Sequence, residues 1–448
     1  MDNQKVLVFG CGISGISAVK LLRRVGKNVI LYDGNPSLDC ANLRAQLGED
    51  QEVEIILGTL EQEVMDTLEC VVMSPGVPTD LSIVNQMRAA NIPIWGEIEL
   101  AYTYGKGDVL AITGTNGKTT TTALLGEILK NYKESVYVVG NIGNPYTEIA
   151  LDMKEDSVAV AEVSSFQLET VHEFHPRVSA ILNITPDHLN RHHTMEAYIA
   201  AKEDIAKNQT SDDTCVLNYE DEVTRKFGEK LNCQVLYFSS LRKLDKGIYL
   251  DEGNIVYRDQ AEVVLCHVDE LQLLGRHNHE NVMAASAMAL AYGVPLEVIQ
   301  KTIRSFKGVA HRIEYVCEKN GVAYYNDSKG TNPDAAIKGI QAMNRRTLLI
   351  GGGYDKDSEY EEWIESFDGK VKHLVLIGQT KEKIADAAKR VGFDRVILRE
   401  TLEDAIKTCA SLAEPGEAVL LSPACASWGM FKNYEERGDK FKEIVNAL

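Results

Sequence analysis

The chain has 448 residues, of which 66 are acidic and 47 are basic, so its formal net charge is −19. This length suggests about three domains, and a composition of 44% hydrophobic and 25% charged residues excludes a disordered or fibrous protein. The acidic balance argues against a nucleic-acid partner, which would require a basic face, and no apolar run approaches the ~20 residues of a membrane-spanning helix.

The nine cysteines indicate a reducing compartment. Their number is odd, no C-x-x-C pair occurs, and Cys11, Cys70 and Cys409 lie in apolar segments where cysteine behaves as a small hydrophobic residue. The N-terminus enters an apolar strand almost at once and carries no signal-peptide pattern. We therefore expect a cytoplasmic protein.

Short apolar runs alternate with helical stretches along the first part of the chain. Residues 5–9 predict a buried strand, which a glycine turn and a helix to about Arg24 follow, and residues 28–32 and 70–73 predict further strands. Such alternation is typical of a parallel sheet with helices on its faces. The pattern of this first unit ends near residue 96.

The pattern starts again at residue 109 and continues to the C-terminus. Predicted strands at 109–113, 136–139, 158–163 and 178–183 precede a helical stretch at 195–207, a strand-rich stretch at 215–268 and a helix that begins near Asn278. A third alternating series predicts strands at 322–325, 346–350, 373–377 and 418–421. We therefore predict three α/β domains, with boundaries at 1–96, 97–308 and 309–448.

The first glycine turn, Gly10-Cys11-Gly12-Ile13-Ser14-Gly15, matches G-x-G-x-x-G between a strand and a helix. Glycines let the backbone approach a pyrophosphate at the helix N-terminus, where the helix dipole favours anions. Asp33 ends the next strand. Its distance along the chain from the glycine turn is close to that of the ribose-binding acid in dinucleotide-binding folds. The motif predicts a bound nucleotide diphosphate and leaves two alternatives, an NAD-dependent dehydrogenase and a tight turn without a ligand.

A second glycine loop, Gly114-Thr115-Asn116-Gly117-Lys118-Thr119-Thr120, lies between a predicted strand and a helix. It provides backbone N–H groups for phosphate, Lys118 to neutralise phosphate oxygens and Thr119 to reach Mg²⁺. It departs from the standard phosphate-binding loop, because the first glycine of that motif would fall at Ile112. Hydride transfer needs no ATP, so this loop favours an ATP-dependent enzyme.

Taken together, the motifs resemble those of the Mur ligase family, in the same order and over the whole chain. Besides the second glycine loop, the matching segments are Gly140-Asn141-Ile142-Gly143, Glu162-Val163-Ser164-Ser165-Phe166-Gln167-Leu168-Glu169, Asn183-Ile184-Thr185-Pro186-Asp187-His188-Leu189, Tyr198-Ile199-Ala200-Ala201-Lys202, His277-Asn278 with Asn281, His311-Arg312 and Asn326-Asp327-Ser328-Lys329-Gly330-Thr331-Asn332.

Three features of the resemblance point to one branch of the family. The segments Ser422-Pro423-Ala424-Cys425-Ala426-Ser427 and Phe431-Lys432-Asn433-Tyr434 resemble those of the D-glutamate-adding branch. Thr119-Thr120 stands where the folylpolyglutamate branch typically has Gly-Ser, and Asn116 stands where the L-alanine-adding branch usually has histidine.

The resemblance implies a fold and a reaction. The fold is α/β in three domains: a Rossmann-like N-terminal domain for a UDP-sugar, a central P-loop ATPase-like domain for ATP, and a C-terminal Rossmann-like domain for D-glutamate. The reaction would add D-glutamate to UDP-N-acetylmuramoyl-L-alanine through an acyl phosphate, with ADP and phosphate released, in peptidoglycan precursor synthesis. It would use Mg²⁺ (two ions, with Mn²⁺ as a possible substitute), and we expect a monomer.

By the same resemblance, a small group of residues would carry the chemistry. Lys118 would hold the ATP phosphates, and Thr119, Glu162 and His188 would bind Mg²⁺. Lys202 would carry a carbamate formed from CO₂ and its neutral amine, and would become a further metal ligand. Without the resemblance, Lys202 would be an ordinary solvated lysine of the helical stretch 195–207.

The remaining residues implied by the resemblance bind substrates. For ATP they are Gly114, Thr115, Asn116, Gly117, Lys118, Thr119, Thr120, Asn278, Asn281, Arg312 and Asp327. For D-glutamate they are Lys329, Thr331, Lys356, Ser427 and Tyr434. For the UDP-sugar they are Ile13 and Ser14 at the pyrophosphate, Asp33, Gly34 and Asn35 at uracil with Ser74 and Gly76 nearby, Asn141 and Gln167 at the sugar and lactyl part, and Ser164. Taken singly, Asn278 and Asn281 could instead cap the helix that begins there.

Several alternatives stay open at this point. His188, His192 and His193 form a cluster that could suggest zinc, although no cysteine or carboxylate at zinc-site spacing accompanies it; for His192 and His193 a surface turn is the simpler interpretation. The alternative functions are another amino-acid ligase of the same family, an NAD-dependent dehydrogenase and a nucleotide-binding regulator without enzyme activity.

Overall fold

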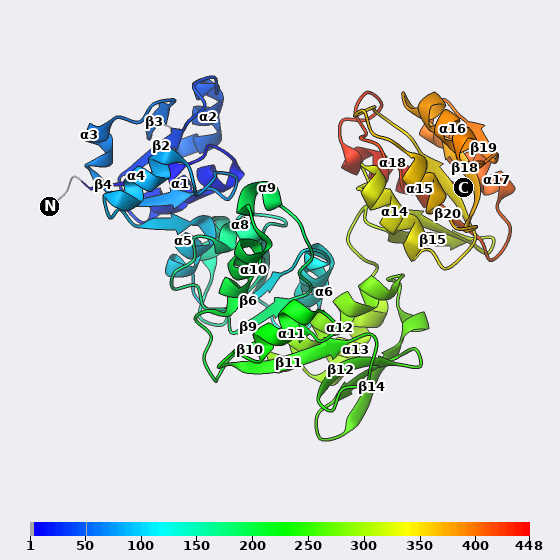
Figure 1. Ribbon diagram of the computed structural model, residues 1–448, viewed down its shortest axis with the longest axis horizontal. Coiled ribbons are helices and arrows are strands. Elements are labelled where there is room, and N and C mark those ends of the chain that lie inside the picture. Colours follow the sequence, from blue (N-terminus) through cyan, green and yellow to red (C-terminus); the bar gives the residue numbers. More distant parts are fainter. Residues whose placement is uncertain (1–3, 51) are drawn as a thin grey trace. The chain divides into compact units, whose positions relative to one another are not determined.

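The structure is a computed structural model that describes residues 4–50 and 52–448. It divides into two compact units (Figure 1). The first unit comprises the residues up to Leu265 together with Glu280–Thr302. The second comprises Cys266–His279 and Ile303–Leu448. Among the described residues, no helix combines the length and the hydropathy needed to cross a membrane.

The first sheet is parallel throughout, in the order β3-β2-β1-β4-β5. Its central strands are buried on both faces, as expected for a parallel sheet that helices cover on two sides. The strands are β1 (Lys5–Phe9), β2 (Val29–Asp33), β3 (Glu54–Leu57), β4 (Leu68–Met73) and β5 (Ile94–Gly96). The helical segments are α1 (Ile13–Arg24), α2 (Cys40–Leu47), η1 (Gly48–Asp50), α3 (Gln62–Met65) and α4 (Ser82–Ala89).

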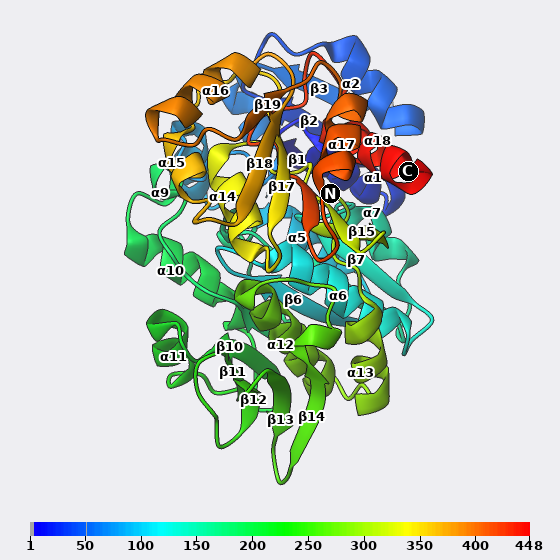
Figure 2. The same cartoon turned by 90° about the vertical axis from the view of Figure 1, so that its right-hand side faces the viewer.

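The central sheet has the order β14-β13-β12-β11-β10-β9-β6-β8-β7. From β7 to β12 in this order neighbouring strands are parallel, and β13 returns antiparallel to β12 as a hairpin. Figure 2 shows β10 to β14 side by side. The strands are β6 (Asp108–Thr113), β7 (Val136–Gly140), β8 (Val158–Glu162), β9 (Val178–Ile181), β10 (Thr214–Asn218), β11 (Gln234–Ser239), β12 (Gly247–Asp251), β13 (Asn254–Arg258) and β14 (Glu262–His267).

Helices of very different length accompany the central sheet, from the single turns α7, α8 and α9 to the long α12. They are α5 (Glu97–Tyr104), α6 (Lys118–Lys130), α7 (Tyr146–Ile149), η2 (Ala150–Asp152), α8 (Ser165–Leu168), α9 (Leu189–His192), α10 (Met195–Glu203), η3 (Asp204–Ala206), α11 (Glu222–Gly228), η4 (Val268–Glu270), α12 (Arg276–Ala291) and α13 (Leu296–Ser305).

The third sheet belongs to the second unit and has the order β15-β16-β20-β17-β18-β19. Only its edge strand β15 is antiparallel to its neighbour. The strands are β15 (Glu314–Lys319), β16 (Val322–Asn326), β17 (Thr347–Gly351), β18 (Val371–Leu376), β19 (Val396–Leu398) and β20 (Ala418–Leu421). The helices are α14 (Pro333–Ala342), α15 (Glu361–Glu365), α16 (Lys381–Arg390), α17 (Leu402–Leu412) and α18 (Tyr434–Ala447).

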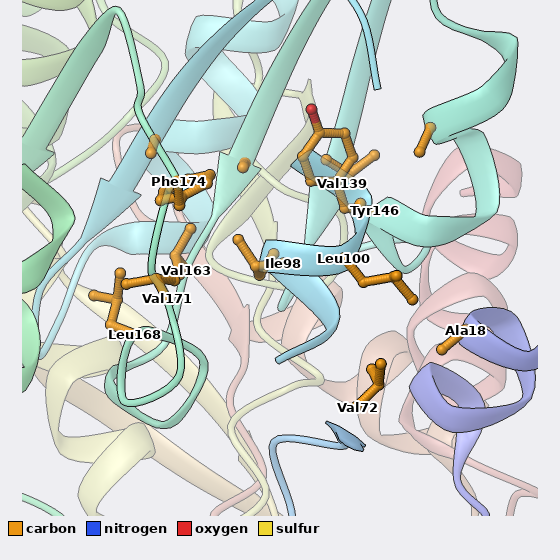
Figure 3. Close-up of a cluster of buried hydrophobic side chains, with 14 of the residues drawn as sticks. Ala18, Val72, Ile98, Leu100, Val139, Tyr146, Val163, Leu168, Val171 and Phe174 are labelled. Carbon is orange, nitrogen blue, oxygen red and sulfur yellow. The ribbon is translucent and has the colours of Figure 1, made fainter. Parts of the chain in front are cut away.

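One hydrophobic core joins the two sheets of the first unit. Ala18 of α1 and Val72 of β4 belong to the same cluster as Ile98 and Leu100 of α5 and Tyr146 of α7 (Figure 3). Each fully buried valine, leucine or isoleucine side chain stabilises a fold by roughly 1.5–3 kcal/mol. The first sheet and the central sheet are therefore held together through α5, and not merely connected by a linker.

The predicted alternation of strands and helices, and the three-domain α/β class, are confirmed. The predicted strands of the three series match observed strands to within two residues at each end. Strand 178–183 ends early, at Ile181, because Asn183 turns to bond the backbone of Thr115 and Asn116. The helical stretch 195–207 is α10, which ends at Glu203, followed by a 3₁₀ turn. The domain boundaries stay a prediction.

Tight packing at the first glycine turn requires glycine at two positions. Gly10 has a φ of +108°, in the region that side chains avoid. A Cβ on Gly15, in the first turn of α1, would collide with the Gly10 carbonyl oxygen. Gly12 has open space around its Cβ position, so it is free of this constraint.

Replacing Gly15 by alanine is expected to lower the free energy of unfolding by about 1–3 kcal/mol, because the added methyl group overpacks the turn. Gly12→Ala is the matched control: nothing lies within 4 Å of its Cβ position and its φ is −76°, so its effect should stay within about 0.5 kcal/mol. Thermal unfolding compares the two variants. An unchanged melting temperature for Gly15→Ala would contradict the packing described here.

Candidate functional site

The carboxyl edge of the central sheet brings several predicted site residues together. Strands β9, β6, β8 and β7 are parallel neighbours, so the segments that follow them leave the sheet at the same edge. The glycine loop 114–117 follows β6 and leads into α6, and Glu162 is the last residue of β8. In open parallel sheets this edge is where ligands bind.

The conformation of the glycine loop depends on two of its glycines and on one asparagine, Asn183. Gly114 and Gly117 have φ values of +147° and +87°, which glycine adopts without strain. The N–H of Asn116 donates to Oδ1 of Asn183 at 2.8 Å. Nζ of Lys118 donates to the carbonyl oxygens of Gly114 at 2.8 Å and Thr115 at 3.0 Å, so its ammonium group lies over the loop. The N-terminus of α6 and this ammonium favour an anion there.

Lys202 is buried beside this loop. Its side chain comes from α10, and Nζ donates to the Gly114 carbonyl oxygen at 2.9 Å and to Oγ1 of Thr113 at 3.4 Å. The same ammonium lies 4.8 Å from the ring centre of Tyr198. Burial, and then the nearby charge of Lys118, lower the pKa of Lys202 to about 7. Lys202 is therefore not the solvated helix lysine that its sequence context alone suggests.

Glu162 has one satisfied and one unsatisfied carboxylate oxygen. The residue is buried, Oε1 accepts a hydrogen bond from Nδ2 of Asn141 at 2.8 Å, and Oε2 is buried without a hydrogen-bond partner. A buried carboxylate oxygen left in this state is destabilising, which fits a residue that accepts a cation. Within the described residues, no group of three or more His, Cys, Asp and Glu side chains is arranged to hold a metal ion. A cation at Glu162 would therefore need other oxygen ligands.

The three histidines of the predicted cluster lie in different environments. His188 is half-exposed, has a left-handed backbone (φ +52°) and packs against the ring of Phe166. His193 is exposed, with Nε2 3.1 Å from Oδ2 of Asp80. The surface-turn interpretation is confirmed for His193 but wrong for His192, which is buried.

His192 is held in place from several sides. Its Nε2 lies 2.9 Å from Oγ of Ser165 and its Nδ1 lies 3.3 Å from Oε1 of Glu169. Its ring stacks on Phe166 and packs against Tyr198. Burial lowers the pKa of His192. These contacts give His192 a packing role. Both of its ring nitrogens already contact protein side chains, so His192 does not support the zinc interpretation.

The first sheet carries a pocket of about 540 Å³ at the G-x-G-x-x-G turn. Seven residues predicted to contact the UDP-sugar line it: Ile13, Ser14, Asp33, Gly34, Asn35, Ser74 and Gly76. Ile13 is 79% exposed at the start of α1. The carboxylate of Asp33 accepts hydrogen bonds from the N–H groups of Cys11 and Asn35, both at 3.0 Å. Asp33 thereby fixes the two loops of the pocket.

The other three residues predicted to contact the UDP-sugar lie at the central sheet. Asn141 donates to Glu162. Ser164 and Gln167 bond each other in a capping box at the start of α8, where Oε1 of Gln167 accepts from the N–H of Ser164 at 2.9 Å. Each side chain is thus engaged by a neighbour within the first unit.

The two predicted ATP-binding asparagines lie inside helix α12, which begins at Arg276. The helix-cap alternative is therefore wrong for both. Asn278 donates from Nδ2 to the Leu274 carbonyl oxygen at 2.8 Å. Oδ1 of Asn281 accepts from Oγ1 of Thr121 at 3.4 Å, and a Cβ on Gly117 would collide with it. Asn281 thus packs directly against the glycine loop.

In the second unit, Asp327 is buried at the end of β16. Its carboxylate accepts hydrogen bonds from Oγ of Ser422 at 2.7 Å and from the N–H of Ile313 at 3.2 Å. Burial raises the pKa of Asp327 to about 7, although these hydrogen bonds oppose the shift. The adjacent Arg312, also predicted to bind ATP, is half-buried.

Four of the residues predicted for D-glutamate lie on loops of the second unit, and the fifth, Tyr434, begins helix α18. The ammonium of Lys329 is 5.7 Å from the ring centre of Tyr434, and that of Lys356 is 4.7 Å from the ring centre of Trp428. Ser427 is buried, and Thr331 follows Lys329 in the same turn, where its N–H bonds the Lys329 carbonyl oxygen.

A buried arginine, Arg437 of α18, fastens these loops to one another. Its guanidinium donates to Oγ of Ser328 at 2.9 Å, to the Ser328 carbonyl oxygen at 2.8 Å and to the Cys425 carbonyl oxygen at 3.1 Å. Oγ of Ser328 in turn donates to the Tyr434 carbonyl oxygen at 2.8 Å. The sequence prediction missed Arg437, because it lies in a strongly charged helix where an arginine is normally solvated. The sequence does offer one indication: Arg437 lies one helical turn after Tyr434, which is itself a predicted site residue.

Comparison with known proteins places these features in a family. Three family models match: the Mur ligase MurD-like N-terminal domain at residues 4–96, the Mur ligase middle domain at 112–289 and the Mur ligase glutamate ligase domain at 311–425. Relatives named UDP-N-acetylmuramoylalanine–D-glutamate ligase include that of Lachnoclostridium phytofermentans, 58% identical over 99% of this chain and 98% of that protein, and that of Clostridioides difficile, 45% identical over 100% and 99%.

Solved structures share the fold. The crystal structure of UDP-N-acetylmuramate-alanine ligase from Thermotoga maritima matches with a TM-score of 0.59 at 20% identity, over 99% of both chains. MurF ligase from the same organism, in complex with ADP, matches with a TM-score of 0.57 at 17% identity, over 99% of this chain and 98% of that one. The chain belongs to the Mur ligase family, in the branch that has the MurD-like N-terminal domain.

Proposed function

We propose that this chain is an ATP-dependent ligase that adds D-glutamate to UDP-N-acetylmuramoyl-L-alanine through an acyl phosphate. The observation that carries the proposal is the sheet edge where the Lys118 loop, the unpartnered oxygen of Glu162 and the buried Lys202 meet. The choice of substrates is supported by relatives 58% and 56% identical over nearly the whole chain, whose names state this reaction.

Joining an amine to a carboxylate in water requires a leaving group on the carboxylate. In the proposed reaction an oxygen of the alanyl carboxylate attacks the γ-phosphorus of ATP, and the bond from that phosphorus to ADP breaks. The amine of D-glutamate then attacks the acyl carbon and phosphate leaves. Both steps bring anions together, so the protein must position them and neutralise their charge.

The glycine loop supplies much of that neutralisation. Backbone N–H groups of residues 114–119, the N-terminus of α6 and Lys118 would hold the ATP phosphates. Thr115, Asn116, Thr120, Asn278, Asn281, Arg312 and Asp327 complete the proposed ATP set. In the present structure the Lys118 ammonium bonds loop carbonyl oxygens, and we expect it to move to phosphate when ATP binds.

The residues present fit a divalent cation at this edge. Oε2 of Glu162 is a buried oxygen without a partner, and carboxylates and hydroxyls are the ligands that Mg²⁺ prefers. Thr119, Glu162, His188 and a modified Lys202 would hold Mg²⁺, as two ions, with Mn²⁺ as a possible substitute. The cation would neutralise phosphate charge during transfer.

The surroundings of Lys202 support its modification by CO₂. Carbamate formation joins the carbon of CO₂ to a neutral amine and releases one proton, so it needs an amine that loses its proton readily. Burial next to Lys118 provides this by lowering the Lys202 pKa to about 7. The hydrogen bonds of Nζ go to two uncharged oxygens, so no bonded carboxylate holds the amine in its charged form.

The other substrates would lie at the first pocket and at the loops of the second unit. The pocket at the first glycine turn would take the UDP part, and Asn141, Ser164 and Gln167 the sugar and lactyl part. Lys329, Thr331, Lys356, Ser427 and Tyr434 would bind D-glutamate, whose two carboxylates need ammonium and hydroxyl partners.

We further propose domains at 1–96, 97–308 and 309–448, and a monomer that works in the cytoplasm, where nucleotide substrates are found.

ADP release should depend on both UDP-N-acetylmuramoyl-L-alanine and D-glutamate. We expect a coupled ADP assay with Mg²⁺ to show turnover when ATP and both substrates are present, and only background when either is omitted. L-Glutamate is the matched control and should give at most background activity. Turnover with L-alanine or L-lysine alone would indicate a different ligase of the family, and reduction of NAD would overturn the ligase assignment.

Lys202→Ala should lower kcat by at least about 100-fold, the scale for removing one preorganised group that stabilises a transition state. Lys202→Arg should be equally inactive, because a guanidinium stays protonated and does not form the carbamate. The exposed Lys226→Ala of α11 is a matched control and should keep full activity.

A second readout tests the modification itself. Incubation with ¹³C-labelled bicarbonate should give a carbamate carbon signal in the NMR spectrum of the unmodified chain, and this signal should be absent from both Lys202 variants. Full activity in Lys202→Arg would show that no carbamate is required.

A further inference from the structure

Arg191 of the short helix α9 bonds the loop that follows β4, and both Arg191 and its neighbour His192 contact Glu169. Nη2 of Arg191 donates to the Val77 carbonyl oxygen and to Oε2 of Glu169, both at 2.9 Å. Oγ1 of Thr79 donates to the same Glu169 oxygen at 3.1 Å. Nδ1 of His192 lies 3.3 Å from Oε1 of Glu169. We call Thr79, Glu169, Arg191 and His192 the clasp.

The ion pair of the clasp is largely removed from solvent. The side chains of Arg191 and Glu169 are 12% and 14% exposed, and the Arg191 guanidinium lies 4.8 Å from the ring centre of Phe166. A buried charged pair is held firmly only when further hydrogen bonds satisfy its remaining atoms. Val77, Thr79 and His192 provide such contacts, which distinguishes the clasp from a surface ion pair.

On one side, the clasp fixes the loop that borders the UDP-sugar pocket. This loop follows β4, and six of its residues line the pocket: Ser74, Pro75, Gly76, Val77, Pro78 and Leu81. Arg191 bonds the backbone of Val77 itself, and Glu169 bonds the side chain of Thr79. The shape of one pocket wall therefore depends on two side chains that are not among the residues lining the pocket.

On the other side, the clasp fixes the segment that carries His188. Helix α9 is a single turn, Leu189–His192, and begins directly after the left-handed His188. A single turn is not stable by itself, so the anchoring of Arg191 and His192 decides where His188 lies. The ring of His192 also packs on Tyr198, whose hydroxyl is 3.0 Å from Oγ1 of Thr115 in the glycine loop.

We propose that Glu169 and Arg191 are positioning residues, which hold the UDP-sugar loop and the His188 segment in one fixed arrangement. This rests on the proposed function, because it assigns the pocket to the UDP-sugar. Without the clasp the loop moves more freely, and the substrate must order it on binding, which weakens affinity. The effect should fall on the UDP-sugar and on kcat, and should spare the affinity for ATP.

Arg191→Met is the main variant, because methionine keeps an apolar stem on Phe166 and removes both hydrogen bonds. We expect the KM for UDP-N-acetylmuramoyl-L-alanine to rise by about tenfold or more, the scale for loss of a charge-assisted hydrogen bond, while the KM for ATP changes less than about twofold. Glu169→Gln keeps the shape of the side chain and removes its charge, and should shift the same KM in the same direction.

Two controls separate positioning from a general loss of stability. Asp80→Asn removes the exposed contact to His193 next to the clasp, and exposed pairs contribute little, so its kinetics should match those of the unmodified chain. The double variant Arg191→Met, Glu169→Gln should raise the KM for UDP-N-acetylmuramoyl-L-alanine no more than the larger single change does, because the two residues act as one unit.

Direct binding completes the test. Titration calorimetry with UDP-N-acetylmuramoyl-L-alanine should show weaker binding to Arg191→Met, and titration with ADP should not. A lower melting temperature with an unchanged KM would show that the clasp is only structural and would overturn the proposal. Failure of the proposed function itself looks different: the unmodified chain would then release no ADP in response to D-glutamate.

Discussion

The site depends on the parallel order β9-β6-β8-β7 of the central sheet. Parallel neighbours end at the same edge, so the glycine loop after β6, Glu162 at the end of β8 and Asn183 after β9 are neighbours in space, although up to 69 residues separate them in the chain. Positive φ values at Gly114 and Gly117 then let the chain leave β6 and turn into α6, whose N-terminus favours an anion. The positions of Lys118 and Lys202 follow from this arrangement.

The groups at this edge include positively charged ones, whereas the molecule as a whole is strongly negative. The net charge of −19 should repel substrates that are themselves anions. In the proposed function, the N-termini of α1 and α6 together with Lys118, Lys329 and Lys356 would counter this repulsion. Lys202 differs from these, because burial beside Lys118 favours its neutral form. The net charge therefore does not predict the charge of the ligands. The buried groups at the sheet edge are the better guide.

The sequence predicted the features that depend on local pattern. Alternating strands and helices, the two glycine turns and the residues around the first pocket all follow from short motifs, and Ile13, Ser14, Asp33 and Ser74 do meet in one pocket. Features that depend on pairs distant in the chain were missed. Arg437 lies in a strongly charged helix and Arg191 lies among polar residues, so both resemble solvated residues. Yet each bonds a backbone carbonyl oxygen, Cys425 or Val77, that no local pattern identifies. The surface-turn prediction for His192 is wrong because its partners, the side chains of Ser165 and Glu169, lie far from it in the chain.

The central claim is that this sheet edge drives amide formation through an acyl phosphate. The direct measurement starts from UDP-N-acetylmuramoyl-L-alanine labelled with ¹⁸O in its alanyl carboxylate, and follows the label during turnover with ATP and D-glutamate. In the proposed reaction the carboxylate oxygen that attacks phosphorus stays with phosphate when the amine displaces it. Mass spectrometry should therefore find one ¹⁸O in each phosphate released. Phosphate without the label would contradict the account.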